Sequence, residues 1–224
     1  MRVALFGGSF DPPHCGHVAL AGLARERLSL DRVLVAPVAA QPLKHELSSA
    51  SFDDRVAMTR LAFANEPSTE VSLIDAPRLD KKFNYTIDTI AALRRQLQPE
   101  DALFCILGAD SFLTVGQWYR SADLLTACDF IVGARPGFAL DRTEAALPNG
   151  ISAQTLPTDL PNTHILELTY RPGRRSRLYV LTDLAEDVSA TEVRSALHGE
   201  AATGTVLSPA VEQYIRVHRL YAHL

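Results

Sequence analysis

The chain has 224 residues, a formal net charge of −4 and 47% hydrophobic residues. This length favours one domain with a sizeable core, and the charge excludes a globally basic surface for gripping nucleic acid. The three cysteines are scattered and lack C-x-x-C spacing, which argues against a disulfide framework and a structural zinc site.

Targeting and membrane signals are missing from the sequence. Residues 1–6 run into a polar, glycine-rich stretch too soon for a signal peptide, and no apolar run approaches the roughly 20 residues that span a bilayer. We therefore expect a cytoplasmic protein with no membrane and no nucleic-acid partner. Four arginines within 171–177 predict a solvated loop, with a phosphate or partner contact as the alternative.

Short apolar runs alternate with amphipathic runs along the chain. Apolar runs predict strands at 3–6, 33–35, 71–74, 103–107, 130–132 and 178–181. Helical spacing predicts helices across 20–28, from Phe52 with Ser51 as cap, from Thr86, over 140–146 and around 211–218. The rest of the proline-rich stretch 136–162 predicts an irregular connection.

This alternation predicts an α/β fold: a Rossmann-like, doubly wound and mainly parallel sheet with helices on both faces. We expect a single domain over 1–224, with the C-terminal helices (about 189–224) packed on it. Ligands in such sheets bind beyond the carboxyl ends of the strands, so the informative residues should follow the strands directly.

The loop after the first predicted strand has the features of a phosphate site. Gly7 and Gly8 allow a sharp turn and a close approach of ligand to backbone. His14 and His17 would share a face in the first turn of a helix, where N–H groups and the dipole favour phosphate. Gly16 between them avoids a side chain that would crowd a nucleotide. Either histidine alone could be structural, but the pair suits stabilisation of a pentavalent phosphorus.

Residues 7–17 read Gly-Gly-Ser-Phe-Asp-Pro-Pro-His-Cys-Gly-His. This segment resembles the signature of the nucleotidyltransferase superfamily with the H-x-G-H motif, and in particular bacterial nicotinate-nucleotide adenylyltransferases. The second motif of that family, Ile-Ser-Ser-Thr-x-x-Arg, has its counterpart in 188–194, which departs from it at Ala190. The resemblance extends over nearly the whole chain. It implies ATP contacts at Gly7, Gly8, Ser9, Phe10, Gly16, Gly108, Asp110, Ser189 and Thr191.

The same resemblance implies a catalytic set that neutralises phosphate charge: His14, His17, Lys44 and Arg194. Lys44 could equally be a surface lysine. Without the resemblance, Ser189 or Thr191 could cap an ordinary helix that carries a solvated Arg194.

The acceptor side of the site also follows from the resemblance. It implies nicotinate mononucleotide contacts at Tyr85, Thr86, Trp118, Tyr119 and Arg135. Thr86 lies at a predicted helix start, where N–H groups and a hydroxyl suit a carboxylate, although it could simply cap the helix. Trp118, the only tryptophan, could stack on the pyridine ring or belong to the core.

The implied reaction is transfer of the adenylyl group of ATP to nicotinate mononucleotide, with pyrophosphate as the leaving group. Mg²⁺ would be carried mainly by ATP, so we expect no dedicated protein metal site. The expected partners are ATP and nicotinate mononucleotide, and a homo-oligomer is possible.

Several alternatives stay open. The acceptor could be nicotinamide mononucleotide or phosphopantetheine, or the transfer could be of a cytidylyl group. A class I aminoacyl-tRNA synthetase fragment also carries H-x-G-H, but the chain has no Lys-Met-Ser-Lys-Ser segment and no basic surface. A nucleotide-sensing module without turnover is the non-enzyme alternative.

Overall fold

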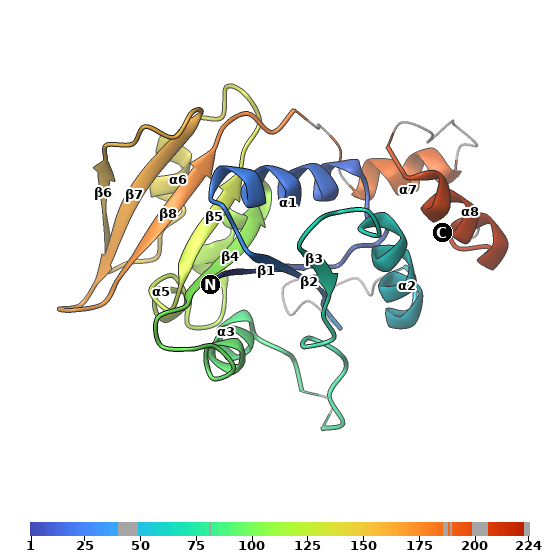
Figure 1. The fold of residues 1–224 in the computed structure, drawn as a ribbon, viewed down its shortest axis with the longest axis horizontal. Coiled ribbons are helices and arrows are strands. Elements are labelled where there is room, and N and C mark those ends of the chain that lie inside the picture. Colours follow the sequence, from blue (N-terminus) through green and yellow to red (C-terminus); the bar gives the residue numbers. More distant parts are fainter. Residues whose placement is uncertain (40–48, 81, 186–187, 189, 199–205, 222–224) are drawn as a thin grey trace.

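The computed structural model describes residues 1–39, 49–80, 82–185, 188, 190–198 and 206–221 (Figure 1). They form an eight-stranded sheet of order β3-β2-β1-β4-β5-β8-β7-β6. Its strands are β1 (Arg2–Gly8), β2 (Arg32–Pro37), β3 (Thr69–Val71), β4 (Ala102–Gly108), β5 (Asp129–Gly133), β6 (Ile151–Leu156), β7 (Thr163–Tyr170) and β8 (Arg175–Leu181). Strands β1 to β5 and β8 are parallel, whereas β6 and β7 pair antiparallel at one edge. This confirms the predicted Rossmann-like, mainly parallel sheet.

Helices cover both faces of the sheet. They are α1 (Cys15–Arg27), α2 (Phe52–Ala62), α3 (Thr86–Arg94), α4 (Ala109–Phe112), α5 (Ser121–Leu124), α6 (Asp141–Ala145), α7 (Ala190–His198) and α8 (Pro209–His218), with a 3₁₀ turn, η1, at Val115–Gln117. Figure 1 shows α1 and α3 on opposite faces. Each face has its own core: α1 packs through Leu20 and Ala24 on one, and α3 through Ile90 and Leu93 on the other.

A third apolar cluster joins the C-terminal helices to α2. Met58 of α2 packs with Val193 of α7 and with Val211 and Ile215 of α8. Hydroxyl caps set where two of these helices begin, as the Ser51 hydroxyl accepts a hydrogen bond from the Asp54 amide and the Ser208 hydroxyl from the Val211 amide. The cluster holds α7 beside the loop that follows β1.

Two sequence predictions are wrong in detail. The third strand ends at Val71 instead of continuing to residue 74, because after a last bond from the Ser72 amide to Val35 the chain turns away from β2. The stretch 136–162 contains the predicted helix as α6, but residues 151–156 form β6 instead of an irregular connection, and β7 was not predicted.

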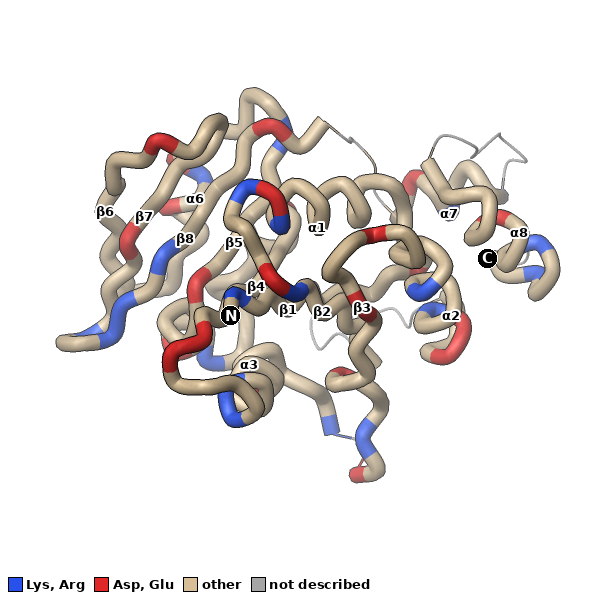
Figure 2. Tube along the Cα trace, viewed as in Figure 1, with Lys and Arg blue, Asp and Glu red and all other residues tan. Residues whose placement is uncertain are grey.

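Only part of the arginine-rich stretch 171–177 is the predicted loop: residues 171–174 form the turn of a hairpin, and residues 175–177 belong to strand β8. Arg171 and Arg174 lie in the turn between β7 and β8, and Arg175 begins β8. Figure 2 shows basic residues gathered at this tip. Arg174 is paired with Asp123 of α5 and Arg175 with Glu167 of β7, so at least two of the four arginines have acidic partners within the fold.

The order of the strands reverses beside β1. The chain passes from β1 over one face to β2, then from β3 over the other face to β4, which also pairs with β1. The carboxyl ends of β1 and β4 therefore border the crevice where sheets of this class bind ligands.

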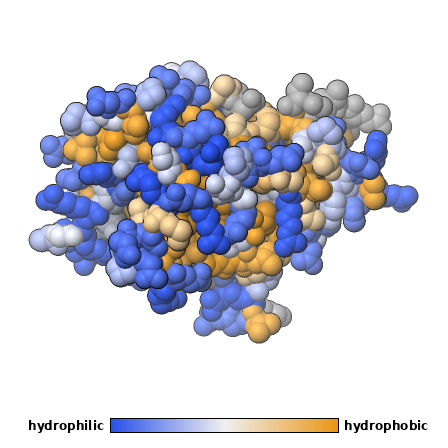
Figure 3. Space-filling model, viewed as in Figure 1, coloured by the Kyte–Doolittle hydropathy of each residue, from blue (hydrophilic) through white to orange (hydrophobic). Residues whose placement is uncertain are grey.

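A separate hollow of about 520 Å³ lies at the amino-terminal ends of β1 and β2, beside the end of α3. Figure 3 shows apolar surface in that region, between α1 and α3.

Candidate active site

The loop from β1 to α1 brings the two predicted histidines together. His14 is the N-cap of α1, with an extended backbone, and His17 is the third residue of the helix. Their ring centroids are 3.7 Å apart, and the His14 amide donates a hydrogen bond of 3.2 Å to Nδ1 of His17. Both imidazoles thus lie at the N-terminus of a helix that follows the central strand, where the positive end of the helix dipole attracts anions.

His14 is buried in a way that disfavours its charged form. It is only 7% exposed, and its Nδ1 atom has no hydrogen-bond partner among the described residues. Desolvation lowers the pKa of His14 to about 4, and the negative charge of Glu192 opposes this only weakly. Without ligand, His14 is therefore neutral at pH 7. An orphaned buried nitrogen at a helix start is a group that a bound anion or water would satisfy.

His17 is fixed by its neighbours. Its Nδ1 accepts from the His14 amide, which places the ring proton on Nε2. The ring also contacts Phe10, with centroids 4.9 Å apart. Phe10 is fully buried with φ of 49°, and a Cβ at Gly8 would lie 3.1 Å from its ring, so a larger residue at position 8 would press on this ring.

Arg194 of α7 reaches the same loop from the other sequence motif. Its Nη1 donates to the Asp11 carbonyl at 2.7 Å and its Nη2 to the Thr191 hydroxyl at 3.3 Å. The two motifs, about 180 residues apart in sequence, therefore meet in space. Thr191 is exposed at the start of α7. Lys44 and Ser189 lie outside the described residues.

The glycines at the strand ends leave room near the backbone. A Cβ at Gly7 or at Gly108 would meet no atom within 4 Å, and these residues end neighbouring strands β1 and β4. Gly16 is buried in the first turn of α1, and Ser9, in the loop that precedes this helix, is half-buried. Asp110 is exposed in α4, directly after β4. These positions border the crevice at the strand reversal.

The predicted acceptor residues lie around the start of α3 and after η1. Tyr85 is the N-cap of α3, so Thr86 is its first residue. The rings of Tyr85 and Tyr119 are 4.3 Å apart, and Tyr119 is half exposed. Trp118 packs partly against the core, and its indole N–H donates to the Thr114 hydroxyl at 3.3 Å. Arg135 follows β5 and is exposed.

Three residues next to the histidine loop were not singled out from the sequence: Asp11, Arg55 and Tyr221. All three are buried and hydrogen-bonded around this loop. Arg55 had a detectable signal, because it lies three residues after Phe52 and one before Val56, on the apolar face of α2. A charged residue on such a face is rarely buried unless it has partners there.

Two imidazoles at a helix start beyond a central parallel strand, joined by an arginine from a second motif, define a nucleotide-binding α/β transferase. Comparison with known proteins agrees with that class. The family model described as cytidylyltransferase-like matches residues 5–196.

Full-length relatives narrow the class. Proteins of Pelobacter propionicus (37% identical, 99% of both chains) and Laribacter hongkongensis (38% identical, 99% of this chain and 94% of the relative) are described as probable nicotinate-nucleotide adenylyltransferases. The fold also matches Plasmodium falciparum nicotinic acid mononucleotide adenylyltransferase complexed with NaAD, at a TM-score of 0.70, 18% identity and coverage of 98% and 97%. The chain belongs to the cytidylyltransferase-like family, among its nicotinate-nucleotide adenylyltransferases.

Proposed function

We propose that this protein transfers the adenylyl group of ATP to nicotinate mononucleotide, giving nicotinate adenine dinucleotide and pyrophosphate in NAD biosynthesis. The observation that carries the proposal is the contact between His14 and His17 at the start of α1, with Arg194 bound to the same loop. The relatives that share more than a third of their residues with this chain are described by this activity.

The reaction is an in-line displacement. A phosphate oxygen of the mononucleotide attacks the α-phosphorus of ATP, the bond from that phosphorus to the bridging oxygen breaks, and pyrophosphate leaves with the electron pair. No covalent enzyme intermediate is needed, so the protein acts by positioning and by stabilising charge. His17 supplies an Nε2–H donor, and His14, Lys44 and Arg194 complete the set that surrounds the phosphates.

The ATP site uses the backbone at the strand ends. Gly7 and Gly8 are the last two residues of β1, and Ser9 and Phe10 follow them in the loop. Gly108 is the last residue of β4, and Asp110 lies in α4 directly after it. The open space at Gly7 and Gly108 supports a nucleotide lying close to the chain there. Ser189 and Thr191 add hydroxyls from the second motif.

The acceptor site lies around α3. The N-terminus of α3 at Thr86 suits the nicotinate carboxylate, since the positive end of the helix dipole lies there. The paired rings of Tyr85 and Tyr119, together with Trp118, provide aromatic surface for the pyridine ring. Arg135 contributes a cation at the end of β5.

Magnesium enters this reaction as part of the MgATP substrate. Among the residues that the structure describes, no group of three or more His, Cys, Asp or Glu side chains is arranged to hold a metal ion. Asp110, which follows β4, is placed to contact a water of the hydrated ion.

Within the part of the chain that the structure describes, no helix is long and apolar enough to cross a bilayer.

The direct test is turnover by the purified protein with MgATP and nicotinate mononucleotide, followed by separation of the dinucleotide and measurement of pyrophosphate. Equal amounts of the two products support adenylyl transfer. ATP binding without either product would identify a nucleotide-sensing module instead.

A further inference from the structure

The guanidinium of Arg55 is buried beside the phosphate-binding loop and binds main-chain carbonyls from two strand ends. The residue is 1% exposed. Its Nη1 donates to the Ser9 carbonyl at 2.6 Å and to the Val38 carbonyl at 2.8 Å, and its Nη2 donates to the Ala39 carbonyl at 3.4 Å. Ser9 follows β1, and Val38 and Ala39 follow β2, so one side chain ties the carboxyl ends of these neighbouring strands together.

Asp11, in the same loop, makes a second connection to the α2 segment. Its carboxylate accepts hydrogen bonds from the Ser49 amide at 2.7 Å, the Ala50 amide at 3.1 Å and the Tyr221 hydroxyl at 2.8 Å. The amides immediately precede α2, the helix that carries Arg55. The loop from β1 to α1 is thus bound to α2 twice, once through Arg55 and once through Asp11.

We propose that Arg55 is a positioning residue for adenylyl transfer: by holding the Ser9 carbonyl against residues 38–39, it fixes the loop that presents His14 and His17 to the reacting phosphates. The proposal rests on the proposed function. Arg55 is buried behind the loop and acts through it, without contact to the substrates.

The energetics favour this role over simple packing. Burial lowers the pKa of Arg55, so its charge is desolvated at a cost, and its Nε has no partner among the described residues. An apolar side chain would pack α2 against the sheet without that cost. A guanidinium offers several donors in one rigid plane, which suits it to fix two backbone segments at once.

The consequence is kinetic. Misplacing reacting groups by about 1 Å costs roughly 10²-fold in rate. Loss of Arg55 should therefore lower kcat more than it raises the KM for either substrate. A lysine keeps the charge but has one donor group in place of a fork, so it should restore part of the lost rate.

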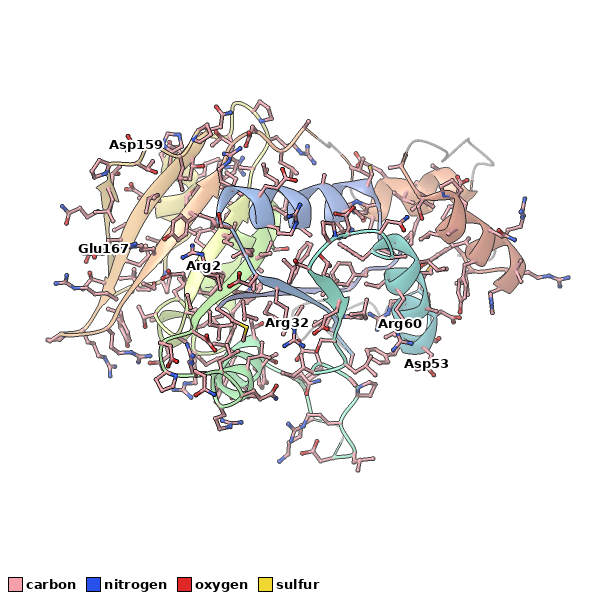
Figure 4. The ribbon with its side chains drawn as sticks, viewed as in Figure 1. Arg2, Arg32, Asp53, Arg60, Asp159 and Glu167 are labelled. Carbon is pink, nitrogen blue, oxygen red and sulfur yellow. The ribbon has the colours of Figure 1, made fainter. Side chains whose placement is uncertain are left out.

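The test compares Arg55→Met and Arg55→Lys with Arg60→Met, in which the same substitution is made at an exposed position of α2 (Figure 4). For each protein, kcat, the KM for ATP and the KM for nicotinate mononucleotide are measured on the folded fraction, with thermal unfolding as a check. We expect kcat to fall at least 10-fold in Arg55→Met, with both KM values within about threefold of wild type. Arg55→Lys should be intermediate and Arg60→Met unchanged.

Values of kcat within twofold of wild type in both folded Arg55 variants would overturn the proposal. A loss of activity that disappears once activity is normalised to folded protein would also overturn the proposal. Failure of both variants to fold would overturn it too. Either result would show that Arg55 serves stability alone. If Arg55→Met alone fails to fold, Arg55→Lys decides. Wild-type protein is assayed in parallel, so absence of product there would count against the proposed function and not against the role of Arg55.

Discussion

The backbone amide of His14 donates a hydrogen bond to Nδ1 of His17, at 3.2 Å, across the first turn of α1. This contact fixes the tautomer of His17, whereas burial keeps His14 neutral. It makes Nδ1 of His17 an acceptor, so the proton resides on Nε2, and it brings the two imidazoles to a centroid distance of 3.7 Å. The site therefore presents a fixed donor on His17 beside a buried, neutral His14.

Removal of either ring should slow turnover. We expect His17→Ala to reduce kcat by roughly 10²-fold or more, the scale of losing one preorganised donor to a charged transition state. His14→Ala should be similarly impaired, and both variants should remain folded. His164→Ala, which changes an exposed histidine on β7, is the matched control. Rates near wild type in either active-site variant would remove that histidine from the catalytic set.

Stability should depend on His14 below neutral pH. The folded-state pKa of His14 is about 4, below the ordinary value of 6.5, so the unfolded chain takes up a proton first as the pH falls. The free energy of unfolding should therefore decrease between pH 6.5 and 4, by up to about 3 kcal/mol from this group. Urea unfolding of wild type and His14→Asn across this range measures the difference. Parallel pH profiles for the two proteins would show that His14 is not buried as described.

We expect bound ATP to occupy the open space at Gly108. A Cβ there meets no protein atom within 4 Å, so Gly108→Ala should leave the melting temperature within a few degrees of wild type while raising the KM for ATP. Gly133→Ala is the opposite case, since its Cβ would clash with Leu20 and lower stability. An unchanged KM for ATP in Gly108→Ala would show that the nucleotide does not approach this strand end.

Ala190 tests the departure from the second family motif. It is the first residue of α7, four before Arg194. If a hydroxyl at this position makes only a marginal phosphate contact, Ala190→Ser should change the KM for ATP less than about tenfold, or 1.4 kcal/mol. A larger change would mean that this helix start binds phosphate differently from what the motif implies.

The sequence predicted the parallel part of the sheet well, because buried strands such as 103–107 and 130–132 are continuous apolar runs. The sequence did not predict the β6–β7 hairpin, for a physical reason. Strand β6 lies at the edge of the sheet and is largely exposed, so Ser152, Gln154 and Thr155 give it no continuous apolar run. Its prolines lie outside the strand, at 148 and 157, and predicted a loop instead.

The histidine pair was predictable because local spacing alone places residues three apart on one helical face. The position of Arg55 on the apolar face of α2 signals that it is buried, but the contacts that Arg55 and Tyr221 make could not be predicted, because their partners Ser9 and Asp11 are distant in sequence. Only the tertiary fold shows that a charged side chain on α2 and a tyrosine near the C-terminus meet the loop after β1.

Acceptor choice follows from the start of α3. The helix start offers hydrogen-bond donors, namely its backbone amides and the Thr86 hydroxyl. A carboxylate can accept hydrogen bonds from these donors with both oxygens. A carboxamide replaces one oxygen with an NH₂ group, which is itself a donor and finds no acceptor there. Buried sites that leave polar groups unpaired discriminate by about 10² or more. Trp118 should contact the ring of either substrate, so Trp118→Ala should weaken both and leave the preference largely intact.

The most direct test is therefore kcat/KM of the purified protein with MgATP and each of two acceptors, nicotinate mononucleotide and nicotinamide mononucleotide. We predict a preference of at least about 10²-fold for the nicotinate form. Equal efficiency with the two mononucleotides would contradict the assignment of nicotinate as acceptor.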